Sequence, residues 1–429
     1  MRLGGRMAAA IEVLGDIEKR KRPVGDALKD WGLSHRFAGS GDRAAIGNIV
    51  YDALRQKMSH GYMMDNDRPS ALVHAVLFRQ WKIGVEQLAA QLLDDQFAPE
   101  PLSEETLKAF AGRKLTDAPL HVQADIPEWT QFAFEENFSD DWVTEAQAFA
   151  QRPPLDLRVN TLKSTVEKTQ KALLRTGAVP TAIARCGLRV AAGEGPSRLP
   201  NVTAEASFQK GWFEVQDEGS QIVSDLIFAQ NGEQVLDYCA GGGGKTLALS
   251  ASMANKGQIH AYDIDRTRLA PIFDRLKRAG TRNVQVHEAG SDLSALIGNM
   301  DRVIIDAPCT GTGTWRRRPE TKWKLTQKTL EERLTQQQEV LASAAAYVRP
   351  QGFLVYITCS VLPQENETQV YEFCEDNTDF ELVSVGEVWQ DLFGESKLQP
   401  WSADMKSITL TPASTETDGF FLAVMQKVR

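Results

Sequence analysis

The sequence predicts an α/β protein, in which a doubly wound parallel sheet follows a small α+β module and an all-helical N-terminal region. Strand-like segments alternate with helical ones from about residue 211, which is typical of a parallel sheet covered on both faces. The Pro153-Pro154 pair separates a short mixed segment from a region with helical apolar spacing. For 429 residues two or three domains are expected, and we place them at 1–150, 151–210 and 211–429.

The N-terminal region is expected to be helical and to carry no chemistry. In DRAAIGNIVYDALRQKM (Asp42–Met58), helical spacing follows a candidate N-cap at Asp42, with apolar residues at Ile46, Ile49, Val50 and Leu54. The histidines of this region form no H-x-x-x-H pair, so we expect core or solvated positions for His35, His60 and His74.

The region 151–210 contains a strand-like segment, Leu155–Thr161, and an amphipathic helical segment, Ser164–Gly177. Its basic side chains have the chemistry to contact phosphates, and they are Arg158, Lys163, Lys168, Lys171 and Arg175. A solvated helix face has the same composition, so the sequence leaves both interpretations open.

The C-terminal region contains the segments predicted as parallel strands, which are Gln234–Ala240, Gln258–Asp265, Asn283–Ala289, Arg302–Pro308 and Gly352–Cys359. Between the second and third lies RTRLAPIFDRLKRAG, predicted as a helix whose apolar face is made by Leu269, Ile272, Phe273 and Leu276. The tail segments SITLTP and FFLAVMQKV are predicted as further strands that close one edge of the sheet.

The composition is that of an ordinary globular protein, with 42% hydrophobic and 24% charged residues. No run of 18 apolar residues predicts a membrane span, and Glu12 and Asp16 interrupt the first apolar stretch, so we expect a cytoplasmic protein without a signal peptide. The five cysteines include no C-x-x-C pair, so neither disulfides nor a metal site is expected. A net charge of -9 argues against a protein that coats nucleic acid indiscriminately.

The segment VLDYCAGGGGKT (Val235–Thr246) passes from a strand through four glycines into a helix, a turn that lets backbone approach a ligand closely. A phosphate-binding P-loop would need a glycine six residues before Lys245, where Cys239 stands. A nucleoside cofactor without phosphates needs an acidic residue at the end of the next strand, and Asp263 occupies that position.

Three aspartates, Asp237, Asp263 and Asp306, are predicted at or near the carboxyl ends of strands, the edge where open α/β sheets bind ligands. S-adenosylmethionine carries a positive charge on sulfur, so it suits a pocket ringed by carboxylates better than a pyrophosphate does. The sequence therefore favours S-adenosylmethionine as the cofactor.

Two cysteines, Cys309 and Cys359, end separate predicted strands that open on the same crevice, so we expect their thiols to lie close together. A methyl donor beside two thiols suits methylation at C5 of a pyrimidine, because thiolate addition at C6 makes C5 nucleophilic. The C5 proton must then be lost, which requires a second group. Asp306 is a candidate hydrogen-bond donor to ring N3, and Lys245 a candidate positive charge for the thiolate.

The segments DAPCTGTGTWRRRPETKW (Asp306–Trp323) and YITCSVLPQENE (Tyr356–Glu367) resemble the paired-cysteine motifs of the Sun (Fmu) family of RNA cytosine-5 methyltransferases. CAGGGGKT resembles the cofactor loop of that family, and FEVQDEGSQIV (Phe213–Val223) and TDGFF (Thr417–Phe421) resemble its flanking signatures. The resemblance covers residues 153–429 and implies a Rossmann-like class I methyltransferase sheet.

By position, the resemblance implies that Cys359 is the nucleophile, that Cys309 assists product release, that Asp306 contacts the cytosine and that Lys245 lies in the active site. It further implies a set of residues around S-adenosylmethionine: Cys239, Ala240, Gly241, Gly242, Gly243, Gly244, Lys245, Asp263, Arg268 and Asp306. Two departures from the family pattern are a glycine at Gly242, where proline is usual, and AGSD after the third strand, which leaves the adenine contact unassigned.

The resemblance also implies an RNA-recognition module at 151–210 and, for the helical region, a likeness to the NusB-like domain of 16S rRNA members. Arg316, Arg317 and Arg318, with Trp315 and Trp323, have the composition of a phosphate-contacting and base-stacking loop, or of a solvated basic loop.

The expected partner is RNA, with ribosomal RNA first and transfer RNA as the alternative, and we expect a monomer with no membrane and no metal. Two rival functions are a DNA cytosine-5 methyltransferase, which would use the cysteine of a Pro-Cys pair as its nucleophile, and a noncatalytic RNA-binding assembly factor that retains the fold.

Overall fold

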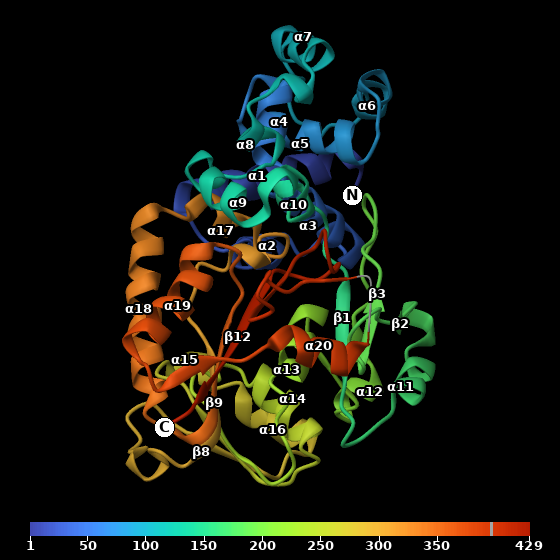
Figure 1. Ribbon diagram of the computed structural model, residues 1–429. Coiled ribbons are helices and arrows are strands. Elements are labelled where there is room, and N and C mark those ends of the chain that lie inside the picture. Colours follow the sequence, from blue (N-terminus) through green and yellow to red (C-terminus); the bar gives the residue numbers. More distant parts are fainter. Residues whose placement is uncertain (395–397) are drawn as a thin grey trace. The chain divides into compact units, whose positions relative to one another are not determined.

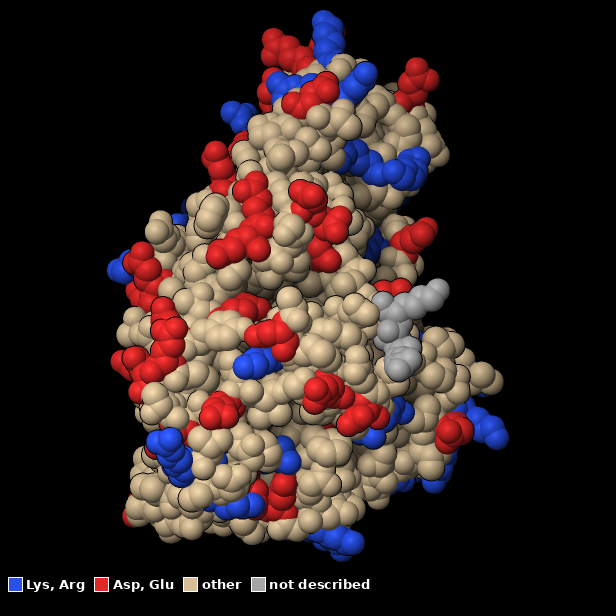
Figure 2. Space-filling model, in the orientation of Figure 1, with Lys and Arg blue, Asp and Glu red and all other residues tan. Residues whose placement is uncertain are grey.

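The computed structural model describes residues 1–394 and 398–429 and divides into two compact units (Figure 1). The helical unit consists of Met1–Pro153, Ala192–Leu199 and Thr314–Leu325, and the sheet unit consists of Pro154–Ala191, Pro200–Gly313 and Thr326–Arg429. Figure 2 shows one face of the molecule, on which acidic and basic side chains are interspersed. Within the described part of the chain, no helix has both the length and the apolar character that a membrane crossing requires.

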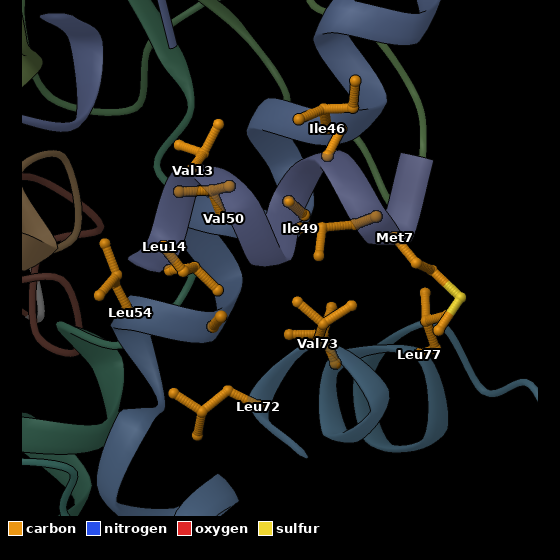
Figure 3. Close-up of a cluster of buried hydrophobic side chains, with 14 of the residues drawn as sticks. Met7, Val13, Leu14, Ile46, Ile49, Val50, Leu54, Leu72, Val73 and Leu77 are labelled. Carbon is orange, nitrogen blue, oxygen red and sulfur yellow. The ribbon is translucent and has the colours of Figure 1, made fainter. Parts of the chain in front are cut away.

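The helical unit is built from short helices: α1 Leu3–Arg20, α2 Val24–Ser34, α3 Ser40–Arg55, α4 Lys57–Met64, α5 Pro69–Ala75, α6 Val85–Leu92, α7 Glu104–Gly112, α8 Leu120–Gln123, α9 Gln131–Phe138, α10 Trp142–Ala148 and α17 Pro319–Lys324. A π-helical turn, Val76–Gln80, follows α5 directly. Apolar side chains from α1, α3, α5 and this turn meet in one core (Figure 3).

The predicted apolar face of α3 is confirmed, because Ile46, Ile49, Val50 and Leu54 are all buried in this core. The predicted N-cap at Asp42 is wrong. The helix begins two residues earlier, at Ser40, and Asp42 instead accepts a hydrogen bond from the backbone N–H of Gly39 at 3.2 Å. A carboxylate in the first turn satisfies an orphan donor from inside the helix as well as a cap does.

The segment 314–325 is part of the helical unit, although the residues on both sides of it in the sequence belong to the sheet unit. Trp315 is fully buried and stacks on Phe134, with ring centroids 5.8 Å apart, and the indole N–H of Trp323 donates to the carbonyl of Leu54 at 2.7 Å. The predicted base-stacking role is therefore wrong for Trp315, and Trp323 packs against the helical core. Of the three arginines, Arg316 is buried and Arg318 is exposed.

We expect Trp315→Ala to destabilise the helical unit by about 3–5 kcal/mol, because it removes a buried ring and leaves a cavity against Phe134. Hydrogen–deuterium exchange measures this locally: amides of α3 and α9 should exchange faster, while strands of the sheet unit keep their protection. Arg318→Ala, at an exposed position on the same segment, is the matched control. Unchanged exchange in α9 would contradict the packing role of the ring.

The sheet unit contains a small antiparallel sheet of order β2-β3-β1-β4, with β1 Leu155–Val159, β2 Val179–Pro180, β3 Gly187–Val190 and β4 Phe213–Val215. The helices α11 Val166–Ala172 and α12 Ala206–Gln209 accompany these strands. Arg158 points inward: it is buried, donates to the carbonyl of Gly244 at 2.8 Å and has its pKa lowered to about 10 by burial. The phosphate-contact interpretation is therefore wrong for Arg158, whereas the other four basic residues of the module are exposed.

The large sheet has the order β10-β12-β9-β8-β5-β6-β7, with β11 paired to β12. Its strands are β5 Gln234–Asp237, β6 Gln258–Tyr262, β7 Val284–His287, β8 Met300–Asp306, β9 Val348–Thr358, β10 Phe380–Leu382, β11 Ser407–Leu410 and β12 Phe420–Lys427. Strands β5 to β9 run parallel, and β12 runs antiparallel to β9. The predicted doubly wound sheet is confirmed, and its strand order reverses between β5 and β8, where such sheets bind ligands.

Helices of the sheet unit are α13 Glu218–Leu226, α14 Gly244–Ser252, α15 Arg266–Leu269, α16 Ile272–Ala279, α18 Gln327–Ala345, α19 Glu367–Asp376 and α20 Val385–Phe393. The single helix predicted over RTRLAPIFDRLKRAG is wrong in two respects. It is divided into α15 and α16 at Ala270-Pro271, and Phe273, predicted on the apolar face, is 51% exposed. Proline lacks the N–H that would continue α15, so α16 begins after Pro271.

Candidate active site

The glycine turn between β5 and α14 is shaped by backbone conformations that glycine adopts without cost. Gly241 and Gly243 have φ of +48° and +79°, in the left-handed region. The N–H of Gly241 donates to Asp263 at 2.9 Å, and a Cβ on Gly243 would lie 2.5 Å from Ile272. The turn therefore packs tightly against the segment that follows β6. Ala240 also ties the turn to β6, because its N–H donates to the carbonyl of Tyr262 at 2.9 Å.

Charged side chains with no predicted role hold the glycine turn in place. Arg275 donates to the carbonyl of Gly242 at 2.5 Å, and both Arg275 and Arg278 pair with the buried Glu214 of β4. In the sequence these arginines have the spacing of a solvated helix face, so no local signal reveals them. Arg158 is the third arginine that supports the turn, because it donates a hydrogen bond to the carbonyl of Gly244.

Three carboxylates lie at the carboxyl edge of the parallel strands, as predicted. Asp237 is fully buried and accepts from the Thr246 hydroxyl at 2.6 Å; burial raises its pKa to about 6, and its second oxygen has no hydrogen-bond partner among the described residues. Asp263 accepts from Gly241 and from the N–H of Asp265. Asp306, at the end of β8, has a side chain that is 38% exposed.

Lys245 pairs with Asp306, Nζ to Oδ2 at 2.6 Å, and its side chain is only 5% exposed. Its Nζ also lies 5.5 Å from the centre of the Phe420 ring. From the sequence we predicted that this lysine stabilises a thiolate. In the structure its ionic partner is the Asp306 carboxylate. An ion pair of this kind keeps Asp306 oriented at the rim of the site.

The two remaining predicted cofactor residues also lie at the turn. Cys239 precedes it and packs against the apolar core, where burial raises the pKa of its thiol. Arg268, in α15, has Nη2 within 3.7 Å of the position that a Cβ on Gly241 would take. All ten residues from Cys239 to Asp306 that the resemblance implies are thus in the segments that end β5, β6 and β8 or begin α14 and α15.

Cys309 and Cys359, fifty residues apart in sequence, have their sulfur atoms 3.4 Å apart. Cys309 follows β8 and Cys359 follows β9, and the parallel pairing of these neighbouring strands brings both to the same edge. The contact with Cys359, followed by burial, raises the pKa of Cys309 well above its ordinary value. At this distance one of the two thiols can donate a hydrogen bond to the other sulfur.

The loops that carry the thiols are hydrogen-bonded to each other and to one further segment, TDGFF (Thr417–Phe421). The N–H of Gly313 donates to the carbonyl of Cys359 at 3.0 Å, and the hydroxyls of Thr312 and Ser360 are 2.9 Å apart. Gly419 donates to the carbonyl of Gly313 at 2.8 Å, so the TDGFF segment lies against the Cys309 loop. A side chain at Gly313 would meet the Gly419 carbonyl at 2.2 Å, which excludes any residue but glycine there.

The arrangement supplies the groups that nucleophilic chemistry needs. Among residues 1–394 and 398–429, no group of three His, Cys, Asp or Glu side chains is placed to hold a metal ion. The site instead offers a thiol pair, a lysine–aspartate pair 2.6 Å apart and a glycine turn with adjoining carboxylates. Such a set fits a covalent reaction on a polarised ring beside a cationic cofactor.

Comparison with protein families gives two matches. Residues 225–426 match the family of the 16S rRNA methyltransferase RsmB/F, and residues 126–193 match the ferredoxin-like domain of RsmF/B-like methyltransferases. The probable ribosomal RNA small subunit methyltransferase B of Synechocystis is 32% identical over 314 residues, which cover 72% of this chain and 68% of the relative. The ribosomal RNA small subunit methyltransferase B of Escherichia coli O6:K15:H31 is 32% identical over 305 residues, or 70% of this chain and 66% of the relative.

Among solved structures, PH0851 is similar over 100% of this chain and 99% of its own, with a TM-score of 0.76 and 24% identity. A methyltransferase homologue from Pyrococcus horikoshii covers 73% of this chain and 98% of its own, with a TM-score of 0.58 and 27% identity. NSun6 from Pyrococcus horikoshii with SFG is similar over 71% of this chain and 98% of its own, with a TM-score of 0.59 and 21% identity. These likenesses support the class I methyltransferase fold.

Proposed function

Because this chain belongs to the RsmB/F family of S-adenosylmethionine-dependent RNA methyltransferases, we propose that it methylates C5 of a cytosine in small-subunit ribosomal RNA. The observation that carries the proposal is the pair of sulfur atoms 3.4 Å apart at the ends of β8 and β9. One nucleophile suffices for many methyl transfers, but a C5 transfer also needs release of a covalent adduct. A second thiol in contact with the first can assist that release by donating a hydrogen bond to the departing sulfur.

The residues of the glycine turn fit S-adenosylmethionine, the cofactor of this family. The glycines of the turn carry no side chains that would block a ligand, Asp263 and Asp306 lie at the adjoining strand ends, and buried Asp237 has an oxygen without a partner among the described residues. These residues, with Cys239 through Lys245 and Arg268, would hold the cofactor. When bound, it supplies an electrophilic methyl group on a positively charged sulfur.

In the proposed reaction, the thiolate of Cys359 adds to C6 of the cytosine, and the displaced electron pair makes C5 nucleophilic. Asp306, held in place by Lys245, is the proposed contact to the cytosine ring. After methylation the C5 proton passes to water, and the electron pair of the C5–H bond forms the C5–C6 double bond. The electron pair of the C6–S bond then returns to the sulfur of Cys359. The Cys309 thiol donates a hydrogen bond to the departing sulfur, which lowers the barrier to release.

We also assign roles to the accompanying parts of the chain. The exposed cations of the small antiparallel sheet, Lys163, Lys168, Lys171 and Arg175, are the proposed phosphate contacts of an RNA-recognition module. The helical unit is proposed as a NusB-like RNA-binding domain. Loss of two cations from the small module should reduce the salt dependence of RNA binding.

Gly243→Ala is expected to weaken S-adenosylmethionine binding about tenfold or more, because the new Cβ both clashes with Ile272 and disfavours the left-handed backbone. Isothermal titration calorimetry with the full chain measures the dissociation constant. Gly298→Ala is the matched control, since this glycine of the same unit also has a left-handed φ, while its Cβ would meet nothing within 4 Å and it lies outside the turn. Equal affinities of the two variants would show that the shape of the turn is not needed.

Transfer of tritium from methyl-labelled cofactor to RNA tests the proposed function. We expect label in small-subunit ribosomal RNA, recovered as 5-methylcytidine after nuclease digestion and mapped by bisulfite sequencing. Label in transfer RNA alone would show that transfer RNA is the substrate. Label in DNA would show that the protein is a DNA methyltransferase. No transfer to any nucleic acid would favour the noncatalytic assembly factor.

A further inference from the structure

Glu365 is a buried carboxylate at the active site for which the proposed reaction has no role. It ends the short helical turn Pro363–Glu365, six residues after Cys359, and it is fully buried. Its own carbonyl accepts from the Tyr356 hydroxyl at 2.7 Å, which ties this turn to β9. A buried carboxylate is costly unless its oxygens accept hydrogen bonds, so the donors that reach it show what it holds.

The donors come from the residues on both sides of Cys309. The N–H of Thr310 donates to Glu365 at 2.8 Å, and the Thr310 hydroxyl donates to its other oxygen. Gln337, on α18, donates from Nε2 both to Glu365 and to the carbonyl of Pro308, each at 3.0 Å. Glu365 and Gln337 therefore fix the residue before Cys309 and the residue after it.

The next residue, Asn366, does the same for Cys359. It is fully buried, accepts from the Thr358 hydroxyl at 2.6 Å and donates to the carbonyl of Ser360 at 3.1 Å. Thr358 and Ser360 are the two neighbours of Cys359 in the chain. Adjacent residues of one turn thus hold both thiol loops, and the 3.4 Å distance between the sulfurs depends on them together.

We propose that Glu365 is a positioning residue that holds the Cys309 thiol against the sulfur of Cys359 during release of the methylated product. The inference rests on the proposed function, because only a covalent reaction needs the release step. A carboxylate suits the position, since the Thr310 N–H and hydroxyl and the Gln337 amide are all donors. A glutamine at 365 would turn an NH2 group toward one of them.

The step that Glu365 serves is the one in which the C6–S bond breaks and its electron pair returns to Cys359. The Cys309 thiol lies within hydrogen-bond distance of that sulfur only while its loop stays in place. In the proposed reaction, addition to C6 uses the sulfur of Cys359 and gives Cys309 no part. Loosening this loop should therefore slow release far more than it slows addition.

The experiment measures the denaturation-resistant RNA–protein adduct and the turnover rate with a 16S rRNA transcript and S-adenosylmethionine. For Glu365→Gln we expect adduct to form within about threefold of the wild-type rate while release slows about tenfold, as befits loss of a buried hydrogen bond. Thr310→Val should act in the same way, and Thr310→Ser, which keeps the hydroxyl, should restore release. Glu372→Gln, at an exposed carboxylate on α19, is the matched control.

Accumulation of adduct in both Glu365→Gln and Thr310→Val supports the inference. Equal slowing of addition and release, with no accumulated adduct, overturns it and leaves Glu365 a residue of the fold. Cys309→Ala separates this failure from failure of the proposed function: if Cys309→Ala itself accumulates no adduct, the proposed reaction is wrong. Should Glu365→Gln fail to fold, the Thr310 pair alone decides, since neither Thr310 variant removes the carboxylate.

Discussion

Cys359→Ala is expected to abolish methyl transfer to RNA, with a rate at least about 10⁴-fold below wild type, because it removes the atom that bonds to C6. No denaturation-resistant adduct should form. Binding of S-adenosylmethionine, measured by calorimetry, should change little, since Cys359 follows β9 whereas the glycine turn follows β5. Tritium transfer and a denaturing gel measure both effects.

The matched control for Cys359→Ala is Cys374→Ala. Cys374 is a half-buried thiol on α19, within the same unit, and packs against the sheet core. It should retain nearly full activity. Residual methylation in Cys359→Ala, with an adduct still visible, would move the nucleophile to another residue and overturn the proposed roles.

Cys309→Ala is expected to accumulate the RNA–protein adduct, because addition at C6 proceeds while release loses its hydrogen-bond donor. Multiple-turnover methylation should fall by about 10²-fold or more, whereas the first turnover remains. A denaturing gel with labelled RNA shows the adduct, and a burst of methylation equal to the amount of enzyme shows the single turnover.

The opposite pattern, with adduct in Cys359→Ala and none in Cys309→Ala, would make Cys309 the nucleophile. That is the arrangement expected for a DNA cytosine-5 methyltransferase, which uses a Pro-Cys cysteine. The contact with Cys359 and burial raise the pKa of the half-buried Cys309, which disfavours a resting thiolate at this position. The structure thus gives a physical reason to expect Cys359 in the attacking role.

Local pattern was enough to predict the architecture of the site. Alternating strands and helices, a glycine turn after the first strand and residues such as Asp263 and Cys309 at later strand ends follow from rules that hold for every parallel sheet. Because parallel strands align their carboxyl ends, two cysteines far apart in sequence were expected to meet. Their sulfurs are 3.4 Å apart.

Only the tertiary structure decided which polar and aromatic side chains are turned inward. Trp315 and Arg158 look like RNA contacts in the sequence, yet Trp315 is buried against Phe134 in the helical unit and Arg158 supports the glycine turn. Glu365 looks like any charged residue of a turn. Its function depends on donors from Thr310 and Gln337, which lie 55 and 28 residues away in the chain. The sequence by itself determined the chemical groups and the sheet edge at which they gather, because strand direction is a local property. Burial and hydrogen-bond partners were decided by the folded chain, because they depend on segments that local patterns do not bring together.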